Sequence, residues 1–282
     1  MSERWQIGAC SWSLQVTSIP ELERLLQQVG LSHTHLALGD PHHASWVEDD
    51  ATFIAAVANA SFTPTAAMLA FPGEDYTTPA TIQKTGGFSD PALRDERLDL
   101  VTWGAAKAKA LGLRIMSVHA GFLPDIGNPE RTVFIDCLRR ALDIAAAQDV
   151  TLAFETGQET ATLLRATLDE LDHPHAKVNF DPANMLLYNK GNPIEAVQIL
   201  GPDIVHVHVK DAKVPLEEGQ WGEEVPLGEG QVSMADYLDA LAEVGYTGSL
   251  AIEREVGDQA ARIRDVQAGA ELLKRLIAQR TV

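Results

Sequence analysis

Cysteine is scarce in this chain, and long apolar runs are absent. The only cysteines are Cys10 and Cys137, which are far apart and outside any CxxC spacing, so the sequence indicates neither a disulfide framework nor a zinc-thiolate site. No apolar run approaches the roughly 18 residues that a membrane span needs, and the first residues lack the pattern of a signal peptide. These absences predict a soluble, cytoplasmic protein that is not bound to a membrane.

Positive charge is also in short supply. Lysine and arginine together number 22 against 40 aspartates and glutamates, which gives a formal net charge of −18. A polyanion would meet an unfavourable field over most of such a surface, so nucleic acid is not an expected partner. The chain has no glycine-rich fingerprint at a strand-to-helix turn, because Gly86 and Gly87 lie elsewhere. This absence weakens a dinucleotide-binding interpretation and slightly favours an unphosphorylated substrate.

Short apolar segments alternate with helical segments along the whole chain. Leucine periodicity, proline near helix starts and glycine at helix ends mark the helices. The expected strands are residues 7–12, 34–39, 62–70, 114–121, 150–155, 177–181, 203–211 and 248–253. The expected helices are residues 20–30, 50–60, 91–112, 128–148, 160–171, 192–201, 233–245 and 258–279, and residues 71–90 are expected to form one long loop.

Alternation of this kind predicts a parallel sheet with helices outside it. Eight such units in 282 residues favour closure as an α/β (β/α)8 TIM barrel, which typically takes about 250 residues, over an open sheet. We expect residues 1–282 to form a single domain. In a barrel all strands point the same way, so their last residues meet at the face where these proteins place their chemistry.

Four consecutive predicted strands end on side chains that bind metals. These are Glu155, Asp181, His208 and Glu253, and His206 shares the side of its strand with His208. Three carboxylates and one imidazole suit a hard or borderline divalent cation, with Mn²⁺ expected first and Mg²⁺, Co²⁺ or Zn²⁺ as alternatives. Taken singly, the presence of each residue at a strand end is as well explained by a structural role, in which its side chain forms hydrogen bonds with backbone donors. Four on successive strands indicate a metal site, because buried carboxylates without a cation would repel one another.

Several motifs of the chain resemble the xylose isomerase-like barrels, and within them the sugar phosphate isomerase/epimerase group. The resemblance covers nearly the whole chain and is carried by residues 154–157, 179–184, 206–211, 226–230 and 252–255. It implies that the same four residues bind the metal and that Glu155 and Glu253 are catalytic. It further implies that the chain forms a homodimer or homotetramer.

The resemblance has two departures at residues that would contact substrate. Ketose 3-epimerases carry a histidine three residues after the metal aspartate, where this chain has Asn184, and an arginine six residues past the metal histidine, where it has Val214.

Around the metal, further expected substrate contacts are His119, Asn184, Lys210, Trp12 and Trp221. The open alternatives are a core role for His119, plain packing for the tryptophans, and a pairing of Lys210 with Asp211. His42 and His43 are expected to make lid contacts at most.

The resemblance implies metal-dependent isomerisation or epimerisation of a keto-sugar or related polyol through an enediolate. A divalent cation would stabilise the enediolate charge, and Glu155 and Glu253 would move protons from two sides. The main alternative is a dehydratase or lyase acting on a keto-inositol or keto-sugar, which shares the enediolate step. An abasic-site endonuclease and a non-catalytic sugar-binding barrel are remote alternatives, the first because the acidic surface opposes DNA.

Overall fold

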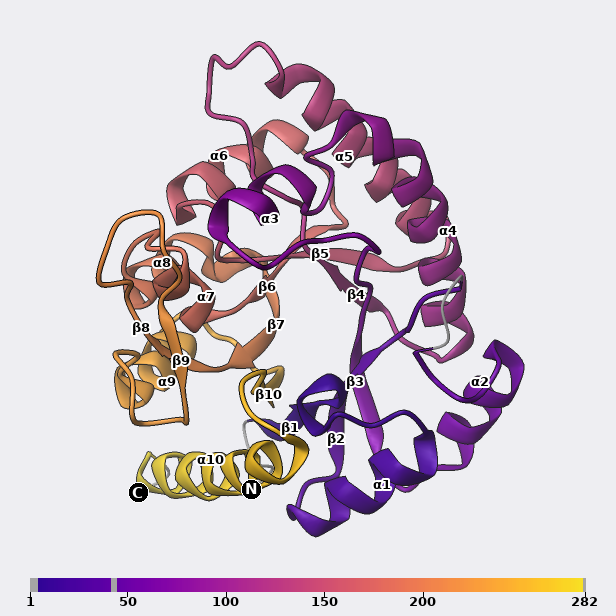
Figure 1. Cartoon of the computed structure of the whole chain (residues 1–282), viewed down its shortest axis with the longest axis vertical. Coiled ribbons are helices and arrows are strands. Elements are labelled where there is room, and N and C mark those ends of the chain that lie inside the picture. The colour runs from indigo at the N-terminus through magenta and orange to yellow at the C-terminus, as the bar shows by residue number, and fades with distance from the viewer. Residues whose placement is uncertain (1–4, 42–44, 281–282) are drawn as a thin grey trace.

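The computed structural model of the protein describes residues 5–41 and 45–280 and contains a closed parallel barrel (Figure 1). Around the barrel the strands follow the order β1-β10-β7-β6-β5-β4-β3-β2. They are β1 Gln6–Cys10, β2 His33–Ala37, β3 Thr63–Met68, β4 Ile115–Val118, β5 Thr151–Glu155, β6 Ala176–Phe180, β7 Ile204–Val209 and β10 Ser249–Ile252. The predicted fold class, a (β/α)8 TIM barrel, is confirmed.

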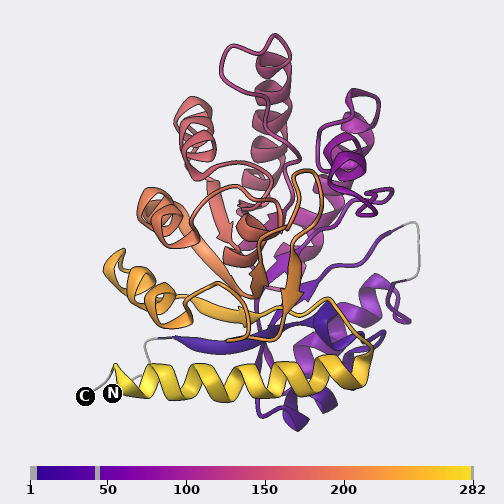
Figure 2. The ribbon, with the colours of Figure 1, turned by 60° about the vertical axis from the view of Figure 1, so that its left-hand side comes forward.

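The helices that cover the barrel form where the sequence predicts them. They are α1 Ile19–Gln28, α2 Asp50–Asn59, α4 Arg94–Ala110, α5 Arg131–Ala146, α6 Ala161–Leu171, α8 Pro193–Leu200, α9 Met234–Glu243 and α10 Gln259–Gln279. Most begin at a side-chain cap, as where Thr160 accepts the Leu163 N–H before α6 and Asp258 accepts the Ala261 N–H before α10. Figure 2 shows them fanned around the strands. None of the helices in the described ranges has both the length and the apolar composition of a membrane span.

Three small elements depart from the prediction. The expected loop at residues 71–90 contains a helix, α3 Pro79–Thr85, which Thr78 caps through a reciprocal bond with Thr81. A six-residue helix, α7 Pro182–Leu187, follows β6 directly. The segment after β7 forms a two-stranded antiparallel hairpin, β8 Asp211–Lys213 with β9 Glu223–Val225. All three lie in βα connections at the carboxyl end of the barrel, where they add to the walls of the functional face.

Asp211 holds the chain after this hairpin in place. Its side chain is 1% exposed, and its two oxygens accept four backbone N–H groups, those of Ala212, Gly228, Gly230 and Val232, at 2.9–3.0 Å. A Cβ at Gly230 would lie 2.1 Å from the carboxylate, so only glycine allows this approach. The alternative that Lys210 pairs with Asp211 is wrong, because backbone donors occupy both carboxylate oxygens and Lys210 binds other carboxylates.

Replacing Asp211 by alanine is therefore expected to destabilise the protein by about 3–5 kcal/mol, because four N–H groups lose a charged acceptor at once. Urea unfolding followed by circular dichroism measures the change. Asp211→Asn keeps one oxygen and should cost less than the alanine variant. Equal stability of the native and alanine proteins would contradict this role for Asp211.

Candidate metal centre and active site

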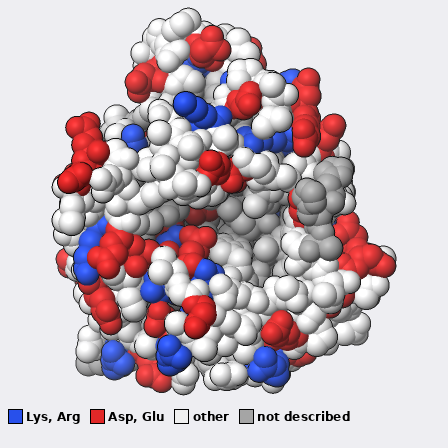
Figure 3. Space-filling view, in the orientation of Figure 1, with Lys and Arg blue, Asp and Glu red and all other residues white. Residues whose placement is uncertain are grey.

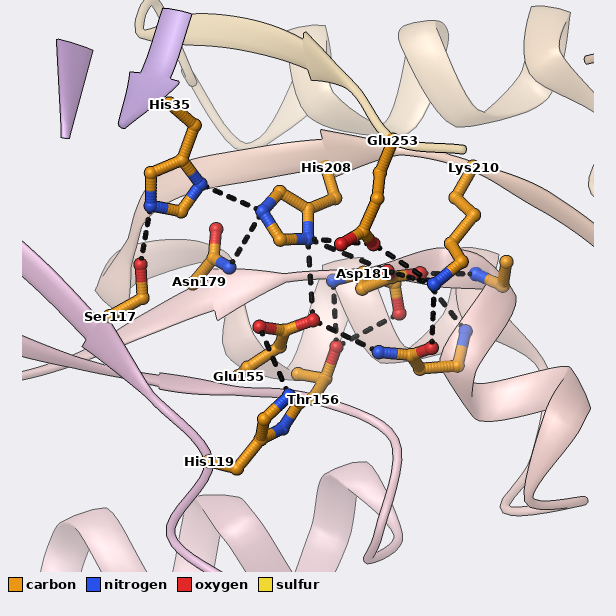
Figure 4. A network of polar contacts seen from close by, with 12 residues as sticks. His35, Ser117, His119, Glu155, Thr156, Asn179, Asp181, His208, Lys210 and Glu253 are labelled. Atoms are coloured by element: carbon orange, nitrogen blue, oxygen red, sulfur yellow. Dashed lines mark hydrogen bonds and ion pairs between the residues drawn. The ribbon is translucent and has the colours of Figure 1, made fainter. Parts of the chain in front are cut away.

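The barrel brings together the four side chains that the sequence singles out. Glu155 is the last residue of β5, His208 lies in β7, and Asp181 and Glu253 directly follow β6 and β10. One ligand atom from each lies within 4.8 Å of the others, and all four residues are buried. His208 Nδ1 is 3.3 Å from Glu155 Oε1, 3.5 Å from Asp181 Oδ2 and 3.3 Å from Glu253 Oε2 (Figure 4). Their role as metal ligands stays a prediction.

The chemistry of this cluster fits a divalent cation. Asp181 Oδ2 and His208 Nδ1 are buried and have no hydrogen-bond partner within the described residues. Buried polar atoms are seldom left without a partner, and three carboxylates held this close repel one another unless positive charge lies among them. Three oxygens and one nitrogen form a donor set typical of Mn²⁺ or Mg²⁺. The residues present therefore fit the group that the sequence predicts.

The pKa values in the cluster show how strongly its members interact. Burial raises the pKa of Asp181 to about 6, although Lys210 acts to lower it. Burial also acts to raise the pKa of Glu155, but His119 and His208 outweigh it and hold that pKa below its usual value. For Glu253 the same burial is outweighed by Lys210 and His208, and its pKa lies well below 4.5. Of the three carboxylates, Asp181 thus depends most on an added positive charge.

His35 and Ser117 orient His208 from behind. The Ser117 hydroxyl donates to the Ala67 carbonyl at 3.2 Å, so its oxygen accepts the Nε2–H of His35 at 2.9 Å. His35 Nδ1 lies 2.8 Å from Nε2 of His208 and accepts its N–H in the tautomer that leaves Nδ1 without a proton, whereas the Asn179 amide nitrogen lies farther from the same Nε2, at 3.3 Å. Burial lowers the pKa of His35 to about 3, which agrees with a neutral ring that carries a single N–H. The relay leaves Nδ1 of His208 facing the carboxylates.

Sequence reasoning missed this relay. Period-2 alternation in the second strand does place His35 on one side of the sheet, but the sequence does not say that this side faces the barrel interior. In the structure His35 is fully buried and its ring centroid lies 5.0 Å from that of His208. An imidazole inside a short predicted strand was the available signal.

Replacing His35 by glutamine is expected to weaken manganese binding by about 10–100-fold, because the orientation of His208 is no longer fixed. Isothermal titration with Mn²⁺ measures this change without reference to activity. His33→Gln, on the same strand with its side chain bonded to Ser32, is the matched control. Equal affinity in the two variants would remove His35 from this positioning role.

Glu253 is held from two sides. Trp12 Nε1 donates to Glu253 Oε1 at 2.6 Å, and the Lys210 ammonium donates to Glu253 Oε2 at 3.0 Å and to Glu255 Oε2 at 2.5 Å. Trp12 also lines the cavity beside the cluster. The neighbouring Arg254 forms ion pairs with Glu224 and Asp265. Both oxygens of Glu253 are therefore engaged by donors of the chain.

Glu155, in contrast, keeps one oxygen open. Its Oε1 accepts the side-chain amide of Asn184 at 3.0 Å, whereas its Oε2 lies 3.7 Å from His119 Nε2. Asn184 can pack here because residue 157 is glycine, since a Cβ at Gly157 would lie 2.4 Å from Asn184 Cβ. His119 follows β4 directly and lines the cavity together with Asn184. Two of the residues predicted to contact substrate, His119 and Asn184, thus flank the carboxylate of Glu155.

A cavity of about 810 Å³ opens beside the cluster. Trp12, His119, Asn184 and Trp221 are among its lining residues, whereas Lys210 lies behind Glu253. Trp221 lies in the loop that leads into β9, and its ring centroid is 4.8 Å from that of Tyr188. The volume lies within the range of about 300–1,000 Å³ typical of small-molecule sites. His42 and His43 lie outside the described residues.

Comparison with known proteins shows the family to which the chain belongs. The sequence model of a family described as xylose isomerase-like TIM barrel matches residues 24–276. A solved xylose isomerase domain protein from Planctomyces limnophilus is 29% identical, with a TM-score of 0.86 over 98% of each chain. L-ribulose-5-phosphate 3-epimerase UlaE of Escherichia coli is 27% identical over 173 residues. That match covers 59% of either protein, so the chain spans about three fifths of the length of this relative.

A dehydratase also shares the fold. The probable 3-DHS dehydratase AsbF of Bacillus anthracis superposes with a TM-score of 0.68 at 19% identity, over 95% of this chain and 98% of that one. At this identity the likeness concerns the fold alone.

Proposed function

Because the chain belongs to the xylose isomerase-like TIM-barrel family, we propose that it is a divalent-metal-dependent isomerase or epimerase of a keto-sugar or related polyol. The observation that carries the proposal is the buried cluster of Glu155, Asp181, His208 and Glu253, which opens on a cavity of small-molecule size. The epimerase activity of UlaE supports the same class of reaction. Manganese is the cation we expect first.

When bound, the cation would supply Lewis-acid stabilisation of the negative charge that develops on the substrate oxygens. Glu155 removes the proton from the carbon beside the carbonyl, because its Oε2 has no hydrogen-bond partner among the described residues. His119, at 3.7 Å from that oxygen, stabilises the carboxylate and contacts a substrate hydroxyl. Asn184 fixes the orientation of the Glu155 side chain through its other oxygen.

Epimerisation requires a second acid–base group on the opposite face of the carbon, and Glu253 has that role in this proposal. Trp12 and Lys210 stabilise the ionised form of Glu253, which makes it the weaker base of the two. Glu155 therefore takes the first proton and Glu253 acts on the other face. Trp12, beside the cluster, and Trp221, across the cavity, offer flat apolar walls for a sugar ring.

Both oxygens of Glu253 accept hydrogen bonds from the chain, and this favours a second candidate function, a dehydratase acting on a keto-sugar or keto-inositol. Removal of one proton and loss of a β-hydroxyl need a single base at the carbon, whereas epimerisation needs access to both faces. Glu155, with its open oxygen, is suited to such a base. The shared fold of AsbF is compatible with this chemistry.

Proton exchange distinguishes the candidates. We expect the manganese-loaded protein to introduce deuterium from D₂O beside the carbonyl of at least one member of a panel of keto-sugars and keto-inositols, without loss of water. NMR of substrate and product measures both events. Loss of water would assign the dehydratase reaction instead. If a bound sugar neither exchanged a proton nor lost water, the chain would be a binding protein and the proposed catalysis would be wrong.

A further inference from the structure

The cavity beside the candidate metal centre is lined by several carboxylates, and within the described residues its only basic side chain is that of His119. Within the described residues its charged lining consists of Asp40, Glu74, Glu155, Glu224, Glu253 and Glu255, without a lysine or an arginine. Figure 3 shows the hollow at the centre of this face, with acidic side chains and some basic ones around its rim. A phosphate ester carries about −1.5 to −2 charges at neutral pH, so this lining opposes its entry.

The nearby cations do not remove this excess. A divalent ion and Lys210 together balance the three carboxylates of the cluster, and Arg254 is paired with Glu224 and Asp265. Glu74 has no ion-pair partner in the part of the chain that the structure describes. Its Oε1 accepts the Gly87 N–H at 2.8 Å, which fixes the carboxylate in the cavity wall. Arg97 and His119 interact with Glu74 from beyond ion-pair distance, so its negative charge in the cavity wall is offset only in part.

The usual phosphate site of a TIM barrel is also occupied by acidic groups. Such sites form from the loops after the seventh and eighth strands, where backbone N–H groups at a helix start face the ligand. In this chain the start of α10 is capped by Asp258, whose carboxylate accepts the Ala261 N–H at 2.8 Å. Glu255, in the same loop, and Glu224, in β9, both line the cavity. A phosphate placed here would meet carboxylates.

Besides Glu224, the part of the cavity next to the hairpin is lined by uncharged aromatic side chains. Trp221 Nε1 is buried and has no hydrogen-bond partner among the described residues, although the ring lines the cavity. The neighbouring Tyr188 packs edge-on against it at 4.8 Å between ring centroids. Aromatic faces and a free indole N–H suit the apolar face and hydroxyl oxygens of an uncharged sugar.

From these observations we infer that the cavity selects an uncharged keto-sugar over its phosphate ester, and that Glu74 enforces this selection. That the ligand is a keto-sugar rests on the proposed function. The inference separates the chain from UlaE, whose name gives a 5-phosphate as substrate. Glu74 repels the phosphate through space, whereas the cavity of about 810 Å³ is large enough for the sugar itself.

The first test compares L-ribulose with L-ribulose 5-phosphate, and D-fructose with D-fructose 6-phosphate, on the manganese-loaded protein. Water proton relaxation of the bound Mn²⁺ measures binding independently of turnover. We expect a free ketose to bind at least about tenfold more tightly than its ester, with the difference shrinking at high salt. The inference is overturned if no free ketose binds more tightly than its ester. Binding of the free sugar without proton exchange would contradict the proposed catalysis and leave the selection intact.

The second test assigns the selection to Glu74. Glu74→Gln keeps an oxygen for the Gly87 N–H and removes the charge, so the preference for the free sugar should fall about tenfold, mainly through tighter binding of the ester. Glu271→Gln is the matched control, since Glu271 is exposed on α10 and absent from the cavity lining. An unchanged preference in Glu74→Gln would remove the role of this residue.

Discussion

Replacing Glu155 by glutamine is expected to lower turnover by about 10³–10⁴-fold while the barrel stays folded, because the proposed base is lost. Glutamine has nearly the same size as glutamate. Its side-chain oxygen can still accept the hydrogen bond that the Asn184 amide donates to Glu155. The open Oε2 of Glu155 is the group that is lost. Turnover is measured by deuterium exchange at saturating Mn²⁺, because the substitution also removes one proposed ligand.

Two comparisons make this experiment specific. Glu253→Gln should also lose turnover, whereas Glu271→Gln, on the exposed side of α10, should keep it. The content of bound Mn²⁺ in each protein shows whether a loss comes from the base or from the cation. Near-normal turnover of Glu155→Gln with metal bound would mean that another group removes the proton.

Replacing Asp181 by asparagine is expected to weaken Mn²⁺ binding by at least about 100-fold and to remove turnover with it. Asp181 has two functions in the structure, one for each oxygen. Oδ1 accepts the N–H groups of Ala183 and Asn184 at the start of α7, at 2.8 and 2.9 Å, whereas Oδ2 faces the cluster. Asparagine keeps an oxygen for the cap and turns an amide N–H₂ toward the cation.

Metal titration and thermal unfolding separate these two functions. The metal-free Asp181→Asn protein should be at least as stable as the native protein, because one of the mutually repelling carboxylates is gone. Asp258→Asn, which changes the cap of α10 in the same way, should bind Mn²⁺ normally. Undiminished Mn²⁺ affinity in Asp181→Asn would show that the cluster does not hold the cation.

Periodic and repeated features of the chain were predictable from the sequence. The eight long helices and eight barrel strands follow from apolar periodicity and from caps, since these act within a few residues of one another. Glu155, Asp181, His208 and Glu253 were found because parallel strands place their carboxyl ends at one edge, whatever the details of packing. The proximity of these four side chains is therefore a property of the strand pattern.

Short elements were not predictable in the same way. The helices α3 and α7 and the β8–β9 hairpin have only three to seven residues per element, too few for a period to appear. Isolated helices of that length are unstable in water, so such segments take their shape from what they pack against. Asp211, for example, shapes the segment after the hairpin by binding N–H groups up to 21 residues away.

The sequence by itself determined the barrel, the helices around it and the rim on which the acidic and imidazole side chains gather. The tertiary structure alone decided that His35 supports His208, that Lys210 binds Glu253 instead of its neighbour in the chain, and that Glu155 keeps an open oxygen while Glu253 does not. The physical reason is the distance along the chain over which each kind of interaction acts. Periodicity records which side of an element is buried, whereas a hydrogen bond between residues 173 positions apart depends on how the closed barrel places two side chains.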